Sequence, residues 1–386
     1  MSTDRSIVPG LETAALRSEP FYRRHLPLIA RVGVPVVISL LVGAVVLAAS
    51  GFNPLAIYGM LGREAFGSLD RIDATLAATT PLIFTALAAA FAYRAGIFTV
   101  GVEGSFAFGG LSAAVVGTQV GGLPPVLAVS ACLAAGLLAG ALVALVPALL
   151  RAVWGVDEVV TTLMLNFIVS GVSGWLVQSY FLAEGQANSA TGYVASAAEL
   201  APLNPPNQTN GGLLIALALV VVYAIWVKKS TLGFQFAMVG SAPRFAVAQG
   251  LRVRLVIITA LVGAGAIGGI GGASHTLGIV HRYSEGFSAT FGFTGIAIAL
   301  LARFNPVGVV VGAILFGALN SAGSTVQLFV NIPIQLIDIL QGTVMILAVA
   351  QFAVPRLLRN RRKRRGATVE PADIPQAAEK KLGDTE

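Results

Sequence analysis

Ionisable and polar residues are scarce within the long apolar runs of this sequence, so each one stands out. Glu103 lies in the run TVGVEGSFAFGG, where glycines permit a broken helix or a close backbone approach. Burying a carboxylate in hydrocarbon is costly, which makes this residue a candidate for a polar substrate path. Asn166 and His275 are further candidates on the same grounds. For each of the three, a hydrogen bond between helices is the alternative role.

A second candidate site is the segment 228–254, which is rich in Lys and Arg and has no Asp or Glu. Ser241 could cap a short helix there, and Pro243 suits its first turn, where a missing N–H costs nothing. Ala246 would keep the helix slim, and Gly250 suits a left-handed stop. Such a helix would fit a groove on another protein. The alternative is a loop whose charges only fix the orientation of the chain.

Catalytic signatures are missing from the sequence. It contains no GxxxxGK[ST] run for cradling phosphates and no HExxH run, and three His with one Cys are too few for a metal site. We therefore predict no catalytic residue, no metal and no cofactor. The protein is not expected to be an enzyme.

Composition indicates the fold class. The 386 residues are 56% hydrophobic and 11% charged, whereas soluble domains average about 25% charged residues. Apolar runs of roughly 20 residues recur, and each is long enough to cross a bilayer. The alternating segments of about 10 residues that a membrane β-barrel needs are absent. The sequence predicts an all-α polytopic membrane protein, in which the net charge of +7 reflects membrane orientation and not nucleic-acid binding.

The apolar runs predict about ten transmembrane helices. Lys and Arg lie almost entirely on one side of them, with only Arg63, Arg71 and Arg282 on the other side, so both termini are expected in the cytoplasm. The eighth run is short and could be a half-helix. The predicted spans are 32–50, 73–93, 97–118, 124–150, 159–182, 211–227, 255–275, 288–302, 306–328 and 334–354.

These spans divide the chain into three parts. Residues 1–31 form a cytoplasmic N-terminal segment, and residues 32–355 form the membrane domain. Residues 356–386 form a basic, disordered cytoplasmic tail that is expected to contact anionic membrane lipid. On the outside, the polar segment 183–210 either meets another protein or is a plain connector.

Several strings of the sequence resemble one family. They are AFAYRAGIFTVGVEGSFAFGG, GVDEVVTTLMLNFIV, GFQFAMVGSAPRFAVAQGL, AIGGIGGASHTLG and FGFTGIAIALLARFNPVGVVVGAILFGAL, and they occur in family order from about residue 63 to 350. They are similar to permease subunits of ATP-binding-cassette importers for nucleosides and simple sugars, the ribose and branched-chain amino acid type. The resemblance implies that residues 228–254 are a coupling loop whose helix, Ser241–Gly250, docks on an ATPase subunit. The expected coupling residues are Gly240, Ser241, Pro243, Arg244, Ala246 and Gly250.

Three positions depart from the family pattern. Thr99 stands where the family often has Asn, Ser105 where it often has Gln, and Asp157 where an Asn is common. Because polar groups near Glu103 could touch the substrate, Thr99 and Ser105 join the candidates for the substrate path.

The resemblance implies a permease subunit in the inner (plasma) membrane of a prokaryote, carrying nucleosides or related ribosyl compounds. Separate ATPase subunits would supply the energy, and an extracytoplasmic binding protein would deliver the substrate. A second permease subunit, a paralogue, is also expected. Alternatives are a permease for a free sugar such as ribose or galactose, an ion-coupled carrier that uses Glu103 and Asp338, and a membrane scaffold that transports nothing.

Overall fold

A computed structural model describes residues 37–38, 40–183, 189–203, 205, 208–284, 286–288, 290–330, 338–339, 341–343 and 346. The N-terminal segment 1–31, the basic tail 356–386 and most of the expected last span, 334–354, lie outside the described residues. Within the described residues the regular structure is helical, and β-pairing is limited to isolated bridges. The predicted all-α fold class is confirmed.

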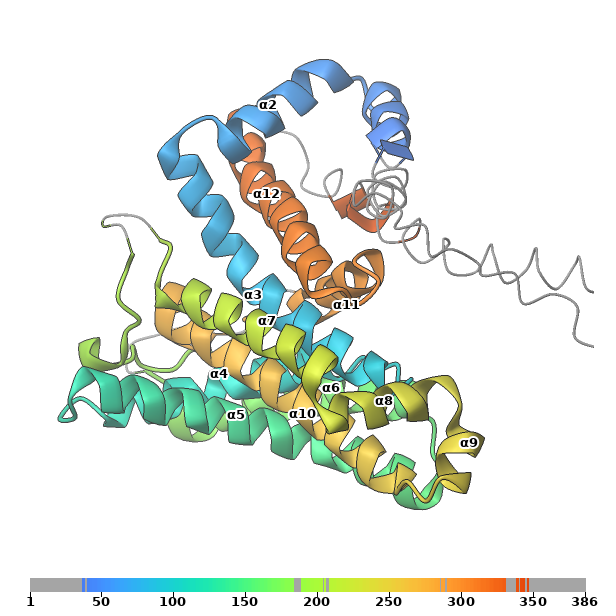
Figure 1. Ribbon diagram of the computed structural model, residues 1–386. Helices are drawn as coiled ribbons and strands as arrows, with labels where there is room; N and C mark the ends of the chain where they lie inside the picture. Colours follow the sequence, from blue (N-terminus) through green and yellow to red (C-terminus); the bar gives the residue numbers. More distant parts are fainter. Residues whose placement is uncertain are drawn as a thin grey trace, which may run out of the picture.

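Six helices in the described part of the chain are long and apolar enough to cross a membrane. They are Leu69–Arg94, Pro125–Trp154, Glu158–Phe181, Gly211–Lys229, Val253–Val280 and Pro306–Gln327. Each coincides with a predicted span. Figure 1 shows the helices under the labels α2 (Pro54–Phe66), α3 (Leu69–Arg94), α4 (Val102–Gln119), α5 (Pro125–Leu149), α6 (Glu158–Leu176), α7 (Gly211–Lys229), α8 (Thr231–Ser241), α9 (Pro243–Ala248), α10 (Val253–His275), α11 (Phe291–Leu301) and α12 (Pro306–Val330). π-Helical turns extend α5 to Trp154, α6 to Phe181 and α10 to Val280.

Two helices differ from the predicted spans. The span predicted at 97–118 begins as a helix only at Val102, because residues 97–100 are not helical. The helix α2 was not predicted at all; Asn53 caps it by accepting from the N–H groups of Leu55 and Ala56. The short eighth span is α11, whose 11 residues reach about 16 Å, half of a bilayer core.

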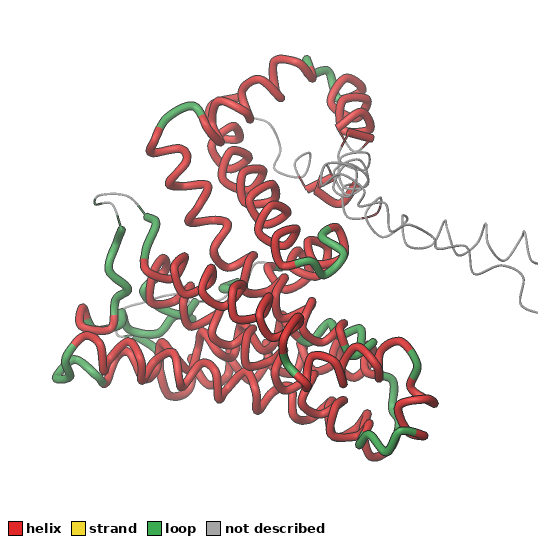
Figure 2. The backbone as a smooth tube through the Cα atoms, in the orientation of Figure 1, coloured by secondary structure: helices red, strands yellow, loops and turns green. Residues whose placement is uncertain are grey.

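Glycines let α4, α5 and α10 pack at backbone contact. A Cβ on Gly269 of α10 would overlap the carbonyl oxygen of Gly136 in α5, and one on Gly109 of α4 would overlap Gly269. Small residues of this kind are how membrane helices approach closely, since dispersion and backbone contacts replace the hydrophobic effect there. Figure 2 shows the resulting stack of long helices. This three-helix core fixes the position of α4, which carries the candidates Glu103 and Ser105.

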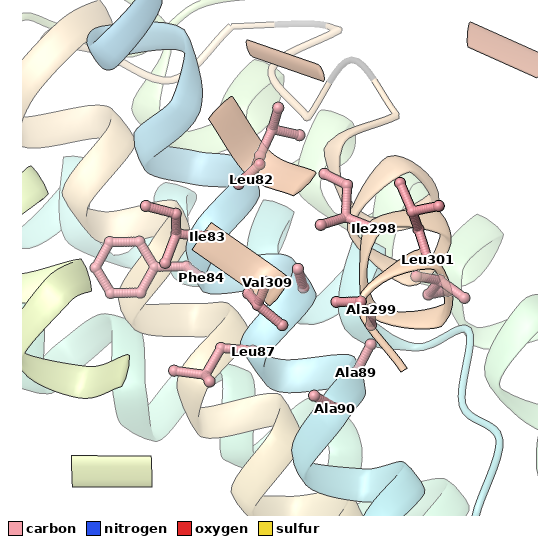
Figure 3. Packing of buried hydrophobic residues seen from close by; sticks show 14 of the residues in the cluster. Leu82, Ile83, Phe84, Leu87, Ala89, Ala90, Ile298, Ala299, Leu301 and Val309 are labelled. Carbon is pink, nitrogen blue, oxygen red and sulfur yellow. The ribbon is translucent and has the colours of Figure 1, made fainter. Parts of the chain in front are cut away.

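The helix α3 links that core to the last helices. In Figure 3, Leu82, Ala89 and Ala90 of α3 lie toward Ile298 and Ala299 of α11, with Val309 of α12 nearby. These side chains belong to one buried cluster. The short α11 is therefore held between α3 and α12, with its first residues free to meet α4.

The segment after α6 is bound to the helix ends at several of its described residues. The N–H of Val194 donates to His281, that of Ala195 to Gly117, and that of Leu200 to Leu277. The Asp73 carboxylate of α3 accepts from the N–H groups of Gln208 and Thr209, at 2.8 and 3.0 Å. These bonds rule out a loose connector for the described part of 183–210, whereas a protein partner for it stays a prediction.

Candidate transport site and coupling loop

The first candidate residues surround the break before α4. The N–H of Val100 donates to Thr162 Oγ1, and its carbonyl accepts from Asn166 Nδ2, at 3.2 and 3.0 Å. Asn166 Oδ1 also accepts from the N–H of Gly104 at 3.0 Å. Backbone groups cannot stay unpaired at membrane depth, so α6 supplies the partners that the broken segment lacks. Asn166 thus bridges α6 to both sides of the break.

Glu103 performs a similar role toward α11. Its carboxylate is buried and accepts from the N–H of Gly292 at 2.6 Å, in the first turn of that helix. Free N–H groups and the helix dipole both favour a negative group at this position. Gly292 is required for the approach, since a Cβ there would lie 2.6 Å from Glu103 Cα. In this conformation, Glu103 joins α4 to the short helix α11.

His275, at the end of α10, lies among aromatic rings. Its ring centroid is 5.9 Å from that of Phe106, 5.2 Å from that of Phe287 and 5.1 Å from that of Phe291. The Nδ1 atom is buried and has no hydrogen-bond partner in the described part of the chain. His275 therefore fills space between α4, α10 and the start of α11.

Thr99 and Ser105 face a cavity of only about 10 Å³ between α4, α5 and α10. This is about enough for one water molecule. Thr99 Oγ1 accepts from the N–H of Gly101 at 3.1 Å, whereas Ser105 Oγ is buried without a partner among the described residues. The cavity is too small for an organic substrate.

A larger cavity lies at the opposite end of α6 from Glu158. Its volume is about 580 Å³, and none of the five predicted path residues lines it. Its walls are Ser170, Gly171, Gly174, Trp175, Val177, Gln178, Ser189, Tyr283 and Gly286. Sequence reasoning missed this site because α6 and Tyr283 are far apart in the chain, and aromatic residues near a span end are ordinarily interface anchors.

The coupling loop contains two helices where one was predicted. The helix α8 runs through Ser241, and α9 begins at Pro243 after a break at Ala242. The predicted cap by Ser241 is wrong: its hydroxyl donates back to the carbonyl of Ala237 at 2.8 Å, within α8. The first-turn position of Pro243 and the left-handed Gly250, with φ +78°, are confirmed.

Ala246 was expected to contact the ATPase subunit, which requires a position on the exposed side of α9. The structure places it on the opposite side. It is fully buried in a cluster with Ala148, Val256 and Ala260. Every other residue of α9 is exposed, and the largest apolar ones are Phe245 and Val247, at 54% and 61%, beside the exposed Arg244. A partner that docks on α9 would meet these large side chains.

Gly240 connects the coupling loop to the break before α4. A Cβ on it would lie 2.7 Å from the carbonyl oxygen of Arg94 and 2.8 Å from the nitrogen of Gly96. Gly96 itself has φ +76°, a conformation that favours glycine. The end of α8 therefore rests on the turn that leads from α3 into α4.

The turn before α6 explains the third departure from the family pattern. Asp157 Oδ1 accepts from the N–H groups of Val159 and Val160, so it caps α6 as an Asn would. Glu158 pairs with Arg151 at 3.1 Å and ties α5 to α6. Both residues have structural roles at this end of the bundle.

A comparison with known protein families matches residues 71–349 to the branched-chain amino acid transport system permease component. The match covers most of the chain, including α3 to α12. The chain belongs to this permease family. Its members are membrane-spanning transport subunits and not enzymes, in agreement with the helices found here. No solved structure matches the chain.

Three curated relatives are similar over most of the length. A nucleoside ABC transporter permease of Lactococcus lactis subsp. cremoris is 30% identical, over 86% of this chain and 92% of the relative. A guanosine ABC transporter permease of Bacillus subtilis is 30% identical, over 89% and 97%. A glucose ABC transporter permease of Haloferax volcanii is 32% identical, over 84% and 88%. Second permease proteins of the first two bacteria also match, at 28% and 26% identity.

Proposed function

We propose that this chain is a permease subunit of an ATP-binding-cassette importer that carries nucleosides, or related ribosyl compounds, across the inner membrane of a prokaryotic cell. The observation that carries the proposal is the pair of relatives that match nearly from end to end. One is a nucleoside permease and the other a guanosine permease. The family membership supports the transport role independently of the substrate.

The proposed complex has further subunits. Separate ATPase subunits power it, and a second permease, a paralogue of this chain, completes the membrane part. The second permease is supported by the comparisons with Lactococcus lactis and Bacillus subtilis. Each of these bacteria has, besides its more similar permease, a less similar one that also matches this chain. An extracytoplasmic binding protein would dock on the segment around 189–210, which the helix ends hold in place.

We place the coupling loop in the cytoplasm, together with both termini. Figure 1 supports this arrangement: the yellow pair α8 and α9 lies at one end of the bundle, and the loop before α7 lies at the other. The end with α8 and α9 carries Lys228, Lys229, Arg244, Arg252 and Arg254. Excess Lys and Arg mark the cytoplasmic side of membrane proteins.

Coupling would proceed along close contacts. An ATPase that binds the exposed face of α9 would move α8, and Gly240 would carry the movement to the turn at Gly96. The break before α4 follows that turn, and Asn166 ties it to α6. The hydrogen bonds of Asn166 would thus make α4 and α6 move together, and the bond from Gly292 to Glu103 would extend the movement to α11.

A free sugar is the second candidate substrate, favoured by the glucose permease of Haloferax volcanii at 32% identity. An ion-coupled carrier gains no support from the two carboxylates on which it would depend. Glu103 is bound to the N–H of Gly292, and Asp338 is exposed.

Uptake by whole cells tests the proposed substrate. Cells with and without this gene take up radiolabelled adenosine or uridine, in the presence of excess unlabelled nucleoside, ribose, galactose or glucose. We expect the gene-dependent uptake to be competed by nucleosides only. Competition by a sugar, with no effect of nucleosides, would make the chain a sugar permease.

A further inference from the structure

We propose that the cavity at the end of α6 is a nucleoside subsite on the transport path, in which Trp175 stacks on the base and Gln178 hydrogen-bonds its polar edge. This inference rests on the proposed function and adds a place and named contacts to it. None of the five polar residues predicted for the path lies in the cavity.

The size of the cavity fits a small organic molecule. Its volume of about 580 Å³ falls within the roughly 300–1,000 Å³ of ordinary ligand sites. The water-sized gap at Ser105, by contrast, holds about 10 Å³. Of these two cavities beside α6, only the larger one can admit a nucleoside in this conformation.

Among the described residues, the lining of the cavity is polar and includes no charged side chain. Its polar side chains are the hydroxyls of Ser170, Ser189 and Tyr283, the indole of Trp175 and the amide of Gln178. An amino acid needs partners for an ammonium and a carboxylate, and a nucleotide needs cations for its phosphate. The described lining offers neither, so it suits a neutral ligand.

Two aromatic side chains give the cavity its flat surfaces. Tyr283 is buried, and its ring packs 4.9 Å from Phe287. Its backbone exchanges hydrogen bonds with Thr191, so this wall is fixed. Trp175 is 56% exposed, and Tyr180 meets its ring at 79° with centroids 5.5 Å apart. An aromatic ring that is supported but open can accept a nucleobase by stacking.

Gln178 stands one turn after Trp175 on α6. Its amide offers two donors and one acceptor, the combination that pairs with the edge of a purine or pyrimidine. One turn before the cavity, Asn166 binds α6 to the break before α4. The helix α6, which lines the cavity, is therefore one of the helices that would move in the proposed coupling.

Photolabelling of the assembled complex with 8-azidoadenosine tests the subsite directly. We expect the label on α6 or on the peptide around Tyr283, and unlabelled adenosine should compete with it. Trp175→Ala should reduce labelling and maximal adenosine uptake about tenfold, and Trp175→Tyr should restore most of both, since base stacking survives. Phe167→Ala is the matched control, because Phe167 is a 70% exposed aromatic on the same helix outside the cavity.

The outcomes separate the subsite from the function. If the wild type imports adenosine but Trp175→Ala behaves as Phe167→Ala does, the subsite is wrong and the nucleoside function stands. If the wild type imports a sugar and no nucleoside, both fail. Copurification of the subunits shows whether Trp175→Ala still assembles. If it does not, Gln178→Ala replaces it, and the same photolabelling should be reduced in that variant.

Discussion

At the residue scale, the candidates Asn166 and Glu103 bind backbone atoms of neighbouring elements. Asn166 binds Val100 and Gly104, and Glu103 binds Gly292. Each pair joins a helix to an interrupted or short element whose backbone would otherwise lack partners. The hydrogen-bonding alternative therefore describes these residues in the present conformation, and a substrate contact by them remains a prediction.

Replacement of Glu103 separates these roles. Glu103→Ala leaves the Gly292 N–H buried without an acceptor, which costs about 1–3 kcal/mol. We expect a lower unfolding temperature for the purified complex, and a smaller loss in Glu103→Gln, whose amide oxygen still accepts. Unchanged thermal stability in Glu103→Ala, with adenosine uptake abolished, would show that the carboxylate acts on the substrate instead.

At the element scale, α9 has an exposed side and a side that packs against its own chain. Phe245 and Val247 are exposed, whereas Ala246 packs against α10 through Val256 and Ala260. The loop also contacts the turn before α4, through the backbone of Gly240. In the proposed mechanism, a movement of α9 would reach that turn through this backbone contact.

Two neighbouring substitutions distinguish the faces of α9. Val247→Glu places a charge on the exposed side, and we expect the permease to fold but to lose its ATPase on copurification. Ala246→Glu buries an unpaired carboxylate within the chain, which costs several kcal/mol and should lower the amount of folded permease itself. Equal retention of the ATPase by Val247→Glu and wild type would remove α9 as the docking element.

Gly240→Ala tests the contact that carries the movement. The added methyl group would come within 2.7 Å of the Arg94 carbonyl, so α8 must move away from the turn before α4. We expect ATP hydrolysis to persist while adenosine uptake per ATP falls several-fold. Gly62→Ala is the control, because the space beside Gly62 is open. Normal uptake per ATP in Gly240→Ala would mean that the movement passes elsewhere.

The spans could be predicted because an apolar run is a local signal. Pro243 and Gly250 were also predictable, because proline and glycine favour particular backbone conformations at their own positions. The break before α4 could not be placed, since its partners Thr162 and Asn166 are distant in sequence and become neighbours only after α6 packs. The burial of Ala246 also could not be predicted from the sequence, because a six-residue helix is too short for its apolar pattern to define a buried face.

At the scale of the whole molecule, the helices form a bundle with distinct ends. The glycine-packed core of α4, α5 and α10 runs between them, and α3 adds α11 and α12 to it. The coupling loop lies at one end and the loop before α7 at the other (Figure 1). The cavity of α6 is on the side of that loop, since Ser189 and Tyr283 line it. This separation is what a transport subunit needs if ATP acts on one side and the substrate enters from the other.

Cysteine labelling tests the orientation of these ends. Gln249→Cys lies in the coupling loop and Ser196→Cys in the opposite segment, and both positions are exposed. The native Cys132 is buried, so a membrane-impermeant thiol reagent should not reach it. In intact cells we expect reaction at position 196 and none at 249 until the membrane is opened. The reverse pattern would invert the proposed topology.

The proposed function is a nucleoside path driven by ATP. Its most direct test is radiolabelled adenosine uptake by proteoliposomes that hold the complete complex, with ATP trapped inside and the binding protein outside. We predict accumulation that requires ATP hydrolysis, persists with an uncoupler, and ignores excess glucose or ribose. Accumulation of a sugar instead, or adenosine uptake that follows an ion gradient without ATP, would contradict the account.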